Sequence, residues 1–186
     1  DTRSWGPPFL TDADGNPTNE SAYYLCANRG KRSVAIDMAT PQGQQLLREL
    51  VVHCDVLVEN YKVGGLKKYG LDWDSLKQIN PKLVYCSITG YGQDGPYAQR
   101  AGYDAAIQAI GGLMSVTGEA DGTPGGGPQK VGVAATDLLT GMYAVAGILA
   151  ALRHAERTGQ GQQIDLALLD TQVAWLANQA SNYLVG

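Results

Sequence analysis

The sequence predicts an α/β fold, in which a mainly parallel, Rossmann-like sheet carries helices on its faces. Short runs rich in β-branched residues alternate along the chain with amphipathic stretches of helical period. Glycine, proline and asparagine mark the turns between them, and no internal repeat is visible. We therefore expect one such domain over residues 33–186, preceded by an irregular, Gly-, Pro- and Asn-rich leading segment at residues 1–32.

The first predicted elements are a strand, a helix and a second strand. The strand candidate is the short run at residues 33–37. Thr40 is suited to cap the following helix and Pro41 to occupy its first position, and leucine and valine recur at helical spacing between residues 46 and 51. The second strand is expected at residues 55–59.

A short helix, a third strand and another helix follow. Asp72 as a cap and Pro81 as a stop bound a helix within residues 71–80. The third strand is expected at residues 82–89, and a helical pattern at residues 103–115 contains a terminating glycine pair.

The last third of the sequence contains a loop, the longest helix and a strand that leads into the last helix. Residues 118–128 form a loop by composition. The long apolar pattern at residues 135–159 ends at Gly159, and residues 161–170 predict the strand. In parallel sheets ligands bind beyond the carboxyl ends of the strands, so the loops after Ile36, Glu59 and Thr89 are where we expect a site.

Gly90, Gly92 and Gly95 spell G-x-G-x-x-G after the third strand, which is the spelling of a dinucleotide-binding turn. That turn requires the third glycine to open a helix, whereas here Pro96 follows and the helical period begins only at Tyr103. The motif is better interpreted as a simple glycine-rich turn, which excludes it as evidence for NAD.

Composition excludes several classes of function. A formal net charge of -4 and a pI near 5.1 give no electrostatic reason to expect nucleic acid or an anionic membrane as a partner. No stretch approaches the roughly 20 continuous apolar residues of a membrane span. The two histidines are isolated, so no metal site is expected. The three dispersed cysteines are interpreted as small buried hydrophobes and, with no export signal visible, favour an intracellular protein.

Several long strings resemble the class III CoA-transferases, the group of formyl-CoA transferase and carnitine CoA-transferase to which acyl-CoA racemases are related. They are "VENYKVGGLKKYGLDWDSL", "KLVYCSITGYGQDGPYAQRAGYDAAIQAIGGLMSVTG", "VGVAATDLLTGMYAVAGILAAL" and "GQGQQIDLALLD". Within the group, the strings "ENY", "YCSITGYGQ", "QRAGYDA" and "ANQASNYLVG" look most like the members that use succinyl-CoA and a dicarboxylate such as glutarate. The resemblance implies part of the family's large domain, with its first strand upstream of Asp1, its small domain beyond Gly186, and an interlocked homodimer.

The resemblance implies that Asp137, in "VGVAATDLLTG", is the nucleophile of CoA transfer. In the family an aspartate attacks the donor thioester, giving an acyl-aspartyl anhydride and then an aspartyl-CoA thioester that the acceptor carboxylate attacks. Independently of the family, Asp137 stands at the start of the longest helix, where terminal amides favour a carboxylate. A purely structural cap is the alternative.

Tyr103 stands where the racemases carry a catalytic histidine, which favours transfer over proton abstraction. It is expected to line the acyl pocket or donate to the carbonyl, with aromatic packing as the alternative. Arg100, a few residues earlier, is proposed to meet the distal carboxylate of a dicarboxylate.

The substrate CoA requires cations for its phosphates and an apolar surface for adenine, and no tightly bound cofactor is expected. Asn60, Tyr61 and Lys68 match CoA-contacting positions of the family, and Ile36 matches an apolar contact on the adenine side. The family often has arginine where Lys68 stands, and lysine lacks its bidentate fork. Lys67, with Lys62, adds positive charge to the same loop, although a solvated lysine cluster is the alternative.

Three classes of function stay open on the sequence alone. The first is an acyl-CoA:carboxylate CoA-transferase, the second a 2-methylacyl-CoA racemase, and the third a CoA-binding module without chemistry. Tyr103 argues against the second and "ATDLLTG" against the third. A succinyl-CoA user would fit the cytoplasm, or the mitochondrial matrix if eukaryotic.

Overall fold

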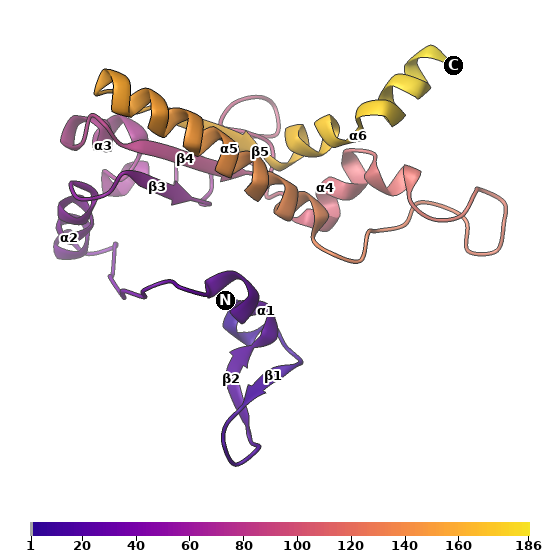
Figure 1. The fold of residues 1–186 in the computed structure, drawn as a ribbon, viewed down its shortest axis with the longest axis horizontal. Coiled ribbons are helices and arrows are strands. Elements are labelled where there is room, and N and C mark those ends of the chain that lie inside the picture. Colours follow the sequence, from indigo (N-terminus) through magenta and orange to yellow (C-terminus); the bar gives the residue numbers. More distant parts are fainter. Residues whose placement is uncertain (1) are drawn as a thin grey trace. The chain divides into compact units, whose positions relative to one another are not determined.

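The computed structural model describes residues 2–186 and divides the chain into two compact units, residues 1–36 and 37–186 (Figure 1). The division lies close to the boundary expected after residue 32. The assignment of residues 33–186 to one large domain stays a prediction.

The N-terminal unit is an antiparallel hairpin with a helix, so the prediction that residues 1–32 are irregular is wrong. Strands β1 (Phe9–Thr11) and β2 (Pro17–Ser21) pair antiparallel, and α1 (Ala22–Asn28) follows directly. The turn between the strands is closed by Asp12, whose carboxylate accepts from the backbone N–H groups of Asp14 and Asn16. These elements rest on polar turn and cap contacts, which hydrophobic periodicity does not reveal.

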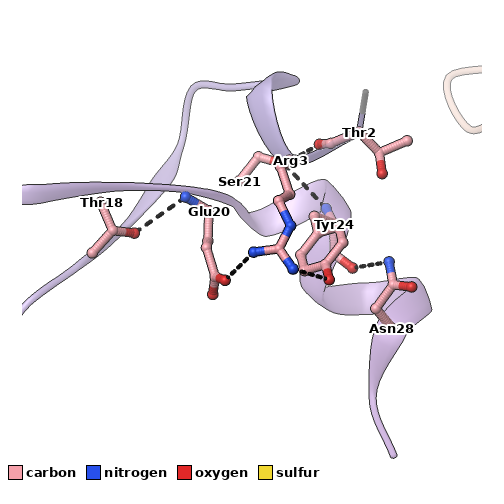
Figure 2. A network of polar contacts seen from close by, with 7 residues as sticks. All are labelled: Thr2, Arg3, Thr18, Glu20, Ser21, Tyr24 and Asn28. Atoms are coloured by element: carbon pink, nitrogen blue, oxygen red, sulfur yellow. Dashed lines mark hydrogen bonds and ion pairs between the residues drawn. The ribbon is translucent and has the colours of Figure 1, made fainter. Parts of the chain in front are cut away.

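A polar network holds the start of the chain against β2 and α1 (Figure 2). The Ser21 hydroxyl caps α1 by accepting from the Tyr24 N–H at 3.1 Å, and donates to the Thr2 carbonyl at 2.7 Å. The Arg3 guanidinium lies between the Glu20 carboxylate and the Tyr24 hydroxyl, each at 2.7 Å. Because Arg3 and Glu20 are exposed, their ion pair contributes little stability, and the buried Ser21 cap is the stronger element.

The strand predicted at residues 33–37 is absent. Residues 31–37 have no regular structure, and Val34 is 70% exposed. Among the described residues no strand pairs with this segment, and a strand without a neighbour is not stable in water. The β-branched residues of this segment favour an extended backbone, but among the described residues no neighbouring strand is present to form a sheet with it.

The second unit is built on a three-stranded parallel sheet in the order β3-β4-β5. Its strands are β3 (Val56–Glu59), β4 (Val84–Thr89) and β5 (Gln163–Ala167). The central strand β4 pairs with both neighbours, Val58 lying opposite Cys86 and Cys86 opposite Ile164. The predicted α/β class is confirmed, and each of these strands lies within a range predicted from the sequence.

The helices of this unit begin and end largely where the sequence predicts. They are α2 (Pro41–Val51), α3 (Trp73–Ile79), α4 (Asp104–Ile110), α5 (Ala135–Thr158) and α6 (Leu168–Val185). Thr40 caps α2 by accepting from the Gly43 N–H at 3.0 Å, and Gly159 ends α5 in a left-handed conformation. The predicted helix at 103–115 is split, because α4 ends before Gly111 and a 3₁₀ turn, Leu113–Val116, follows.

Each face of the sheet packs against helices. A cluster of buried apolar residues lies on the α2 and α3 side and contains Val51, Leu66, Leu71, Leu76, Leu83 and Tyr85. On the other side α5 runs along β4 and β5 and contacts α4 and α6 (Figure 1). Thr140 of α5 and Thr171 of α6 share a buried hydrogen bond of 2.7 Å, which fixes how these helices meet. α6 is kinked at Ala177, where φ is 31°.

Among the described residues one helix, α5, is long and apolar enough to cross a membrane by length and composition alone. Over its most apolar 18 residues the mean hydropathy is 1.5, although it contains no unbroken run of 20 apolar residues. The same composition is typical of helices that pack inside folded domains, and α5 packs on two strands and two helices.

Leu76→Ala should lower the free energy of unfolding by about 2–5 kcal/mol, because Leu76 is 0% exposed and its removal leaves a cavity under the sheet. Urea denaturation measures this. Leu46→Ala in α2, where the side chain is 53% exposed, is the control and should change stability by less than about 0.5 kcal/mol. Equal effects of the two substitutions would contradict the described core.

Candidate active site

The carboxyl ends of β3 and β4 meet at one edge of the sheet and are tied together there. The Asn60 side chain, just after β3, donates from Nδ2 to the Ile88 carbonyl of β4 at 2.6 Å. The Thr89 hydroxyl accepts from the Gly92 N–H at 2.9 Å and so closes the turn after β4. Two of the three loops predicted to carry chemistry are thus adjacent, while the loop after Ile36 follows no strand.

These two loops and the segment before α4 line a cavity of about 200 Å³, which we call the edge cavity. Its lining contains four residues predicted from the sequence and others from the same segments: Asn60, Tyr61, Lys62, Val63, Thr89, Gly90, Ala98, Gln99, Arg100, Ala101, Gly102 and Tyr103. Predicted CoA-contacting and acyl-contacting residues therefore share one cavity.

The glycine motif shapes the wall of the edge cavity. A Cβ on Gly90 would lie 2.5 Å from the Gly102 Cα, so the loop after β4 and the loop before α4 approach backbone to backbone. Gly92 and Gly95 have φ values of 86° and 88°, which glycine adopts without strain. The motif is a turn that permits this close approach, in agreement with the interpretation made from the sequence.

Arg100 and Tyr103 lie at the mouth of the edge cavity. The Arg100 guanidinium stacks over the Tyr97 ring, 4.1 Å from its centroid, which orients the charge without an ion pair. Tyr103 is 73% exposed and forms the N-cap position of α4 without a capping hydrogen bond from its side chain. Its exposure argues against the alternative of simple aromatic packing within this chain.

Of the three lysines in the segment after β3, two line cavities and one does not. Lys62 lines both the edge cavity and a second cavity of about 230 Å³, which Lys67 also lines. Lys68 lines neither, and its ammonium lies 4.7 Å from the centroid of the Tyr69 ring. Ile36 belongs to the N-terminal unit, so its adenine contact stays a prediction, as do the phosphate contacts of the lysines.

Asp137 is the third residue of α5 and does not cap it. The N-cap position is Ala134, and among the described residues no hydrogen bond to the Asp137 carboxylate is formed. The residue is exposed, yet partial burial of its carboxyl group raises the pKa above the ordinary value, and the negative charge of Asp104 raises it further. The structural alternative of a helix cap is therefore wrong for this side chain.

Asp104 is the site residue that the sequence reasoning missed. It is the first residue of α4, directly after Tyr103, and its Oδ1 accepts from the Thr136 N–H at 2.8 Å and from the Thr136 hydroxyl at 2.6 Å. Thr136 directly precedes Asp137. Asp104 therefore joins the wall of the edge cavity to the helix that carries the predicted nucleophile, although Asp137 itself is not part of the cavity lining.

The remaining titratable groups do not form a metal site. Within residues 2–186, as the structure describes them, no group of three or more His, Cys, Asp or Glu could hold a metal ion. Cys86 is buried and Cys54 half-buried, whereas Cys26 is exposed, so the interpretation of all the cysteines as buried is wrong for Cys26.

Comparison with known proteins assigns the family. The model of CoA-transferase family III matches residues 1–186, and the chain belongs to that family. It is 57% identical over 185 residues to the succinate–glutarate CoA-transferase of Agrobacterium fabrum, and 48% identical over 186 residues to the human succinyl-CoA:glutarate CoA-transferase. These alignments cover 100% of this chain but only 45% and 40% of the two relatives.

The structural comparison agrees. A crystal structure of a CAIB/BAIF family protein from Brucella suis matches with a TM-score of 0.91 and 54% sequence identity, covering 100% of this chain and 47% of that one. The chain therefore spans less than half the length of the relatives it matches, and the resemblance inferred from the quoted strings is confirmed at the level of the family.

Gly90→Ala should lower kcat/KM for CoA transfer about tenfold or more in the complete protein, because a Cβ there forces the two loops of the edge cavity apart. Gly141→Ala is the control: a Cβ there meets nothing within 4 Å, and alanine is favoured in the helix α5. Steady-state kinetics measure both. Unchanged kinetics in Gly90→Ala would contradict the role given to this close approach.

Proposed function

We propose that this chain is part of an enzyme that transfers CoA from succinyl-CoA to a dicarboxylate such as glutarate, through an aspartyl-CoA thioester on Asp137. The proposal rests on the family, on the names of its relatives in Agrobacterium fabrum and human, and above all on one structural observation. That observation is an exposed carboxylate without hydrogen-bond partners among the described residues, at the start of α5, tied through Thr136 and Asp104 to the wall of the edge cavity.

The chemistry of this proposal uses Asp137 as a carboxylate nucleophile. Its oxygen attacks the thioester carbonyl of the acyl-CoA, and the CoA thiolate leaves, giving an acyl-aspartyl anhydride. The thiolate then attacks the aspartyl carbonyl and releases the donor carboxylate, which leaves CoA on Asp137. The acceptor carboxylate and the returning thiolate repeat these steps in reverse, so that no water or redox partner is consumed.

The surroundings of Asp137 suit a nucleophile that forms and loses covalent bonds. A carboxylate fixed by several hydrogen bonds would be a poorer nucleophile and would have to give those bonds up, whereas this one carries none among the described residues. Its raised pKa gives more basicity and hence more nucleophilicity than an ordinary aspartate. The dipole of the 24-residue helix α5 supplies a favourable field for the ionised form.

The edge cavity is the proposed place for the reacting end of the substrate. Tyr103 and Arg100 at its mouth are the proposed contacts for the acyl carbonyl and the distal carboxylate, and Asn60 and Tyr61 for the CoA arm. Lys62, Lys67 and Lys68 follow Asn60 and Tyr61 in the segment after β3. They are proposed to provide positive charge for the phosphates of CoA. CoA is a substrate in this scheme rather than a resident cofactor.

A racemase is disfavoured by the position of its possible bases. Tyr103 replaces the histidine that proton abstraction would use. His154 is 17 residues beyond Asp137 in the same helix, which places it about 25 Å away. His53 follows α2, outside the edge cavity. The interlocked homodimer and a cytoplasmic or mitochondrial-matrix location belong to the proposal as well.

Asp137→Ala should abolish formation of glutaryl-CoA from succinyl-CoA and glutarate, because the variant has no carboxylate to carry CoA. Product is followed by mass spectrometry in the complete protein, with circular dichroism as the check of folding. The control is Asp170→Asn, an exposed aspartate in the first turn of α6, which should keep wild-type turnover. Persistent turnover in Asp137→Ala would sink the aspartyl mechanism.

The pH profile of kcat/KM should have an acidic limb at higher pH than an ordinary aspartate gives, because only the ionised Asp137 attacks, and burial and the charge of Asp104 raise its pKa. Activity should therefore be present at neutral pH and be lost as pH falls through this raised pKa. Rates over a pH series in buffers of constant ionic strength measure the limb. A limb at or below the ordinary aspartate value would contradict the described environment.

Solvent exchange separates transfer from racemisation. In deuterated water, succinyl-CoA and 2-methylacyl-CoA incubated with the protein should gain no deuterium at the α-carbon, since Tyr103 stands in place of the histidine that would act as the second base. Mass spectrometry of the recovered thioesters measures this. Exchange at a rate comparable with CoA transfer would favour the racemase.

A further inference from the structure

We propose that Asp104 and Gln108 are positioning residues for Asp137, forming a polar brace that holds the start of α5 and the loop before it against α4. This inference rests on the proposed function, because it assigns a role toward the nucleophile of that reaction. Neither residue belongs to the set of positions that the sequence singled out, and neither lines the edge cavity.

Asp104 supplies the first half of the brace. Its Oδ1 accepts two hydrogen bonds from Thr136, through the backbone N–H at 2.8 Å and the hydroxyl at 2.6 Å. An α-helix leaves its first N–H groups without internal partners, so a carboxylate from α4 here acts as the cap that Ala134 cannot provide. The next residue after Thr136 is Asp137, whose backbone is thereby fixed.

Gln108 supplies the second half. Its side chain is 0% exposed, and it lies one turn after Asp104 on α4. The amide Nε2 donates to Asp104 Oδ2 at 2.7 Å and to the Val133 carbonyl at 3.3 Å, while Oε1 accepts from the Val131 N–H at 2.9 Å. The Val131 N–H can only donate, which settles the orientation of the amide. Gln108 thus orients Asp104 and holds the loop that leads into α5.

The brace connects the two parts of the proposed site. α4 begins at the residue after Tyr103, which lines the edge cavity, and α5 carries Asp137. The attack distance between a thioester in the cavity and Asp137 therefore depends on how α4 and α5 sit relative to each other. A misplacement of about 1 Å is enough to lower a rate about a hundredfold, so a half-buried hydrogen-bonded connection at this point matters for turnover.

The charged groups around Asp137 give the brace a second measurable effect. From α4, Asp104 acts on Asp137 by repulsion. From the loop before α5, the Lys130 ammonium donates to the carbonyls of Val131 and Val133, and the exposed Asp170 in the first turn of α6 is not among the charges that shift the pKa of Asp137. Removing or displacing the negative charge of Asp104 should therefore lower the pKa of Asp137.

An exchange of donor and acceptor tests the brace. Asp104→Asn removes the acceptor for Gln108 Nε2, and Gln108→Glu places two carboxylates against each other, so each should lower kcat about tenfold or more. In the double variant the new amide donates to the new carboxylate, whose other oxygen still accepts from the Val131 N–H, while the hydrogen bond from this side chain to the Val133 carbonyl is lost, so the recovery is partial. The double variant should therefore regain at least tenfold over the slower single variant.

Each variant is made in the complete protein, with Asp137→Ala and Glu156→Gln beside them. Glu156 is exposed in the last turns of α5, 19 residues after Asp137 and outside both cavities, and Glu156→Gln should keep wild-type kinetics. In Asp104→Asn and in the double variant the acidic limb of kcat/KM should move to lower pH, because the negative charge next to Asp137 is gone or lies further away. Circular dichroism and CoA affinity report separately on folding and binding.

The outcomes separate the brace from the proposed function. Loss in both single variants, recovery in the double variant and a lower acidic limb support the brace. If Asp137→Ala is inactive but both single variants keep wild-type kcat and pH profile, the proposed function stands and the brace is overturned. Additive losses in the double variant also overturn it, since independent structural lesions behave in this way. Turnover in Asp137→Ala instead rejects the proposed function itself.

Discussion

The hydrogen bonds from Thr136 to Asp104 are the interaction on which the proposed site depends. They are the direct polar link between the start of α5, where Asp137 stands, and the start of α4, which borders the edge cavity. Residues 32 positions apart in sequence meet there, so no local pattern creates the contact. Without it, α4 and α5 would keep their packing and the bonds of Gln108, but the start of α5 would lose its cap and the nucleophile would be held less firmly relative to the cavity.

A second constraint comes from the parallel sheet. Because β3 and β4 run in the same direction, their carboxyl ends lie side by side, and the loops after them must share one edge. The Asn60 side chain links the two strand ends directly by donating to the carbonyl of Ile88. The close approach of Gly90 and Gly102 then draws the segment with Arg100 and Tyr103 onto the same edge. Few further contacts between the loops are needed to form the site, because the pairing of β3 with β4 already places both loops at one edge.

Much of this arrangement is visible in the sequence, and the exceptions have physical reasons. Periodicity with Thr40, Pro41 and Gly159 located α2 and α5, since such caps act within a few residues. The sequence strings around Asn60, Tyr103 and Asp137 indicated the family. They also indicated the residues that line the edge cavity and the aspartate at the start of α5. The strand at residues 33–37 was wrong because a strand depends on a partner, which local composition does not report. The N-terminal hairpin was missed because Asp12 and Ser21 build it from polar contacts.

Asp104 and Gln108 were not found for a similar reason. Their spacing of four in a short helix is a visible signal, but their meaning lies in the partners at Val131 and Thr136, which only the fold brings close. Mass spectrometry of the complete protein, incubated with succinyl-CoA and no acceptor, shows whether CoA is carried on Asp137. One CoA, joined with loss of water, is expected on the peptide that contains Asp137. CoA on another residue, or turnover with no covalent species at Asp137 in a rapidly quenched reaction, would contradict this expectation.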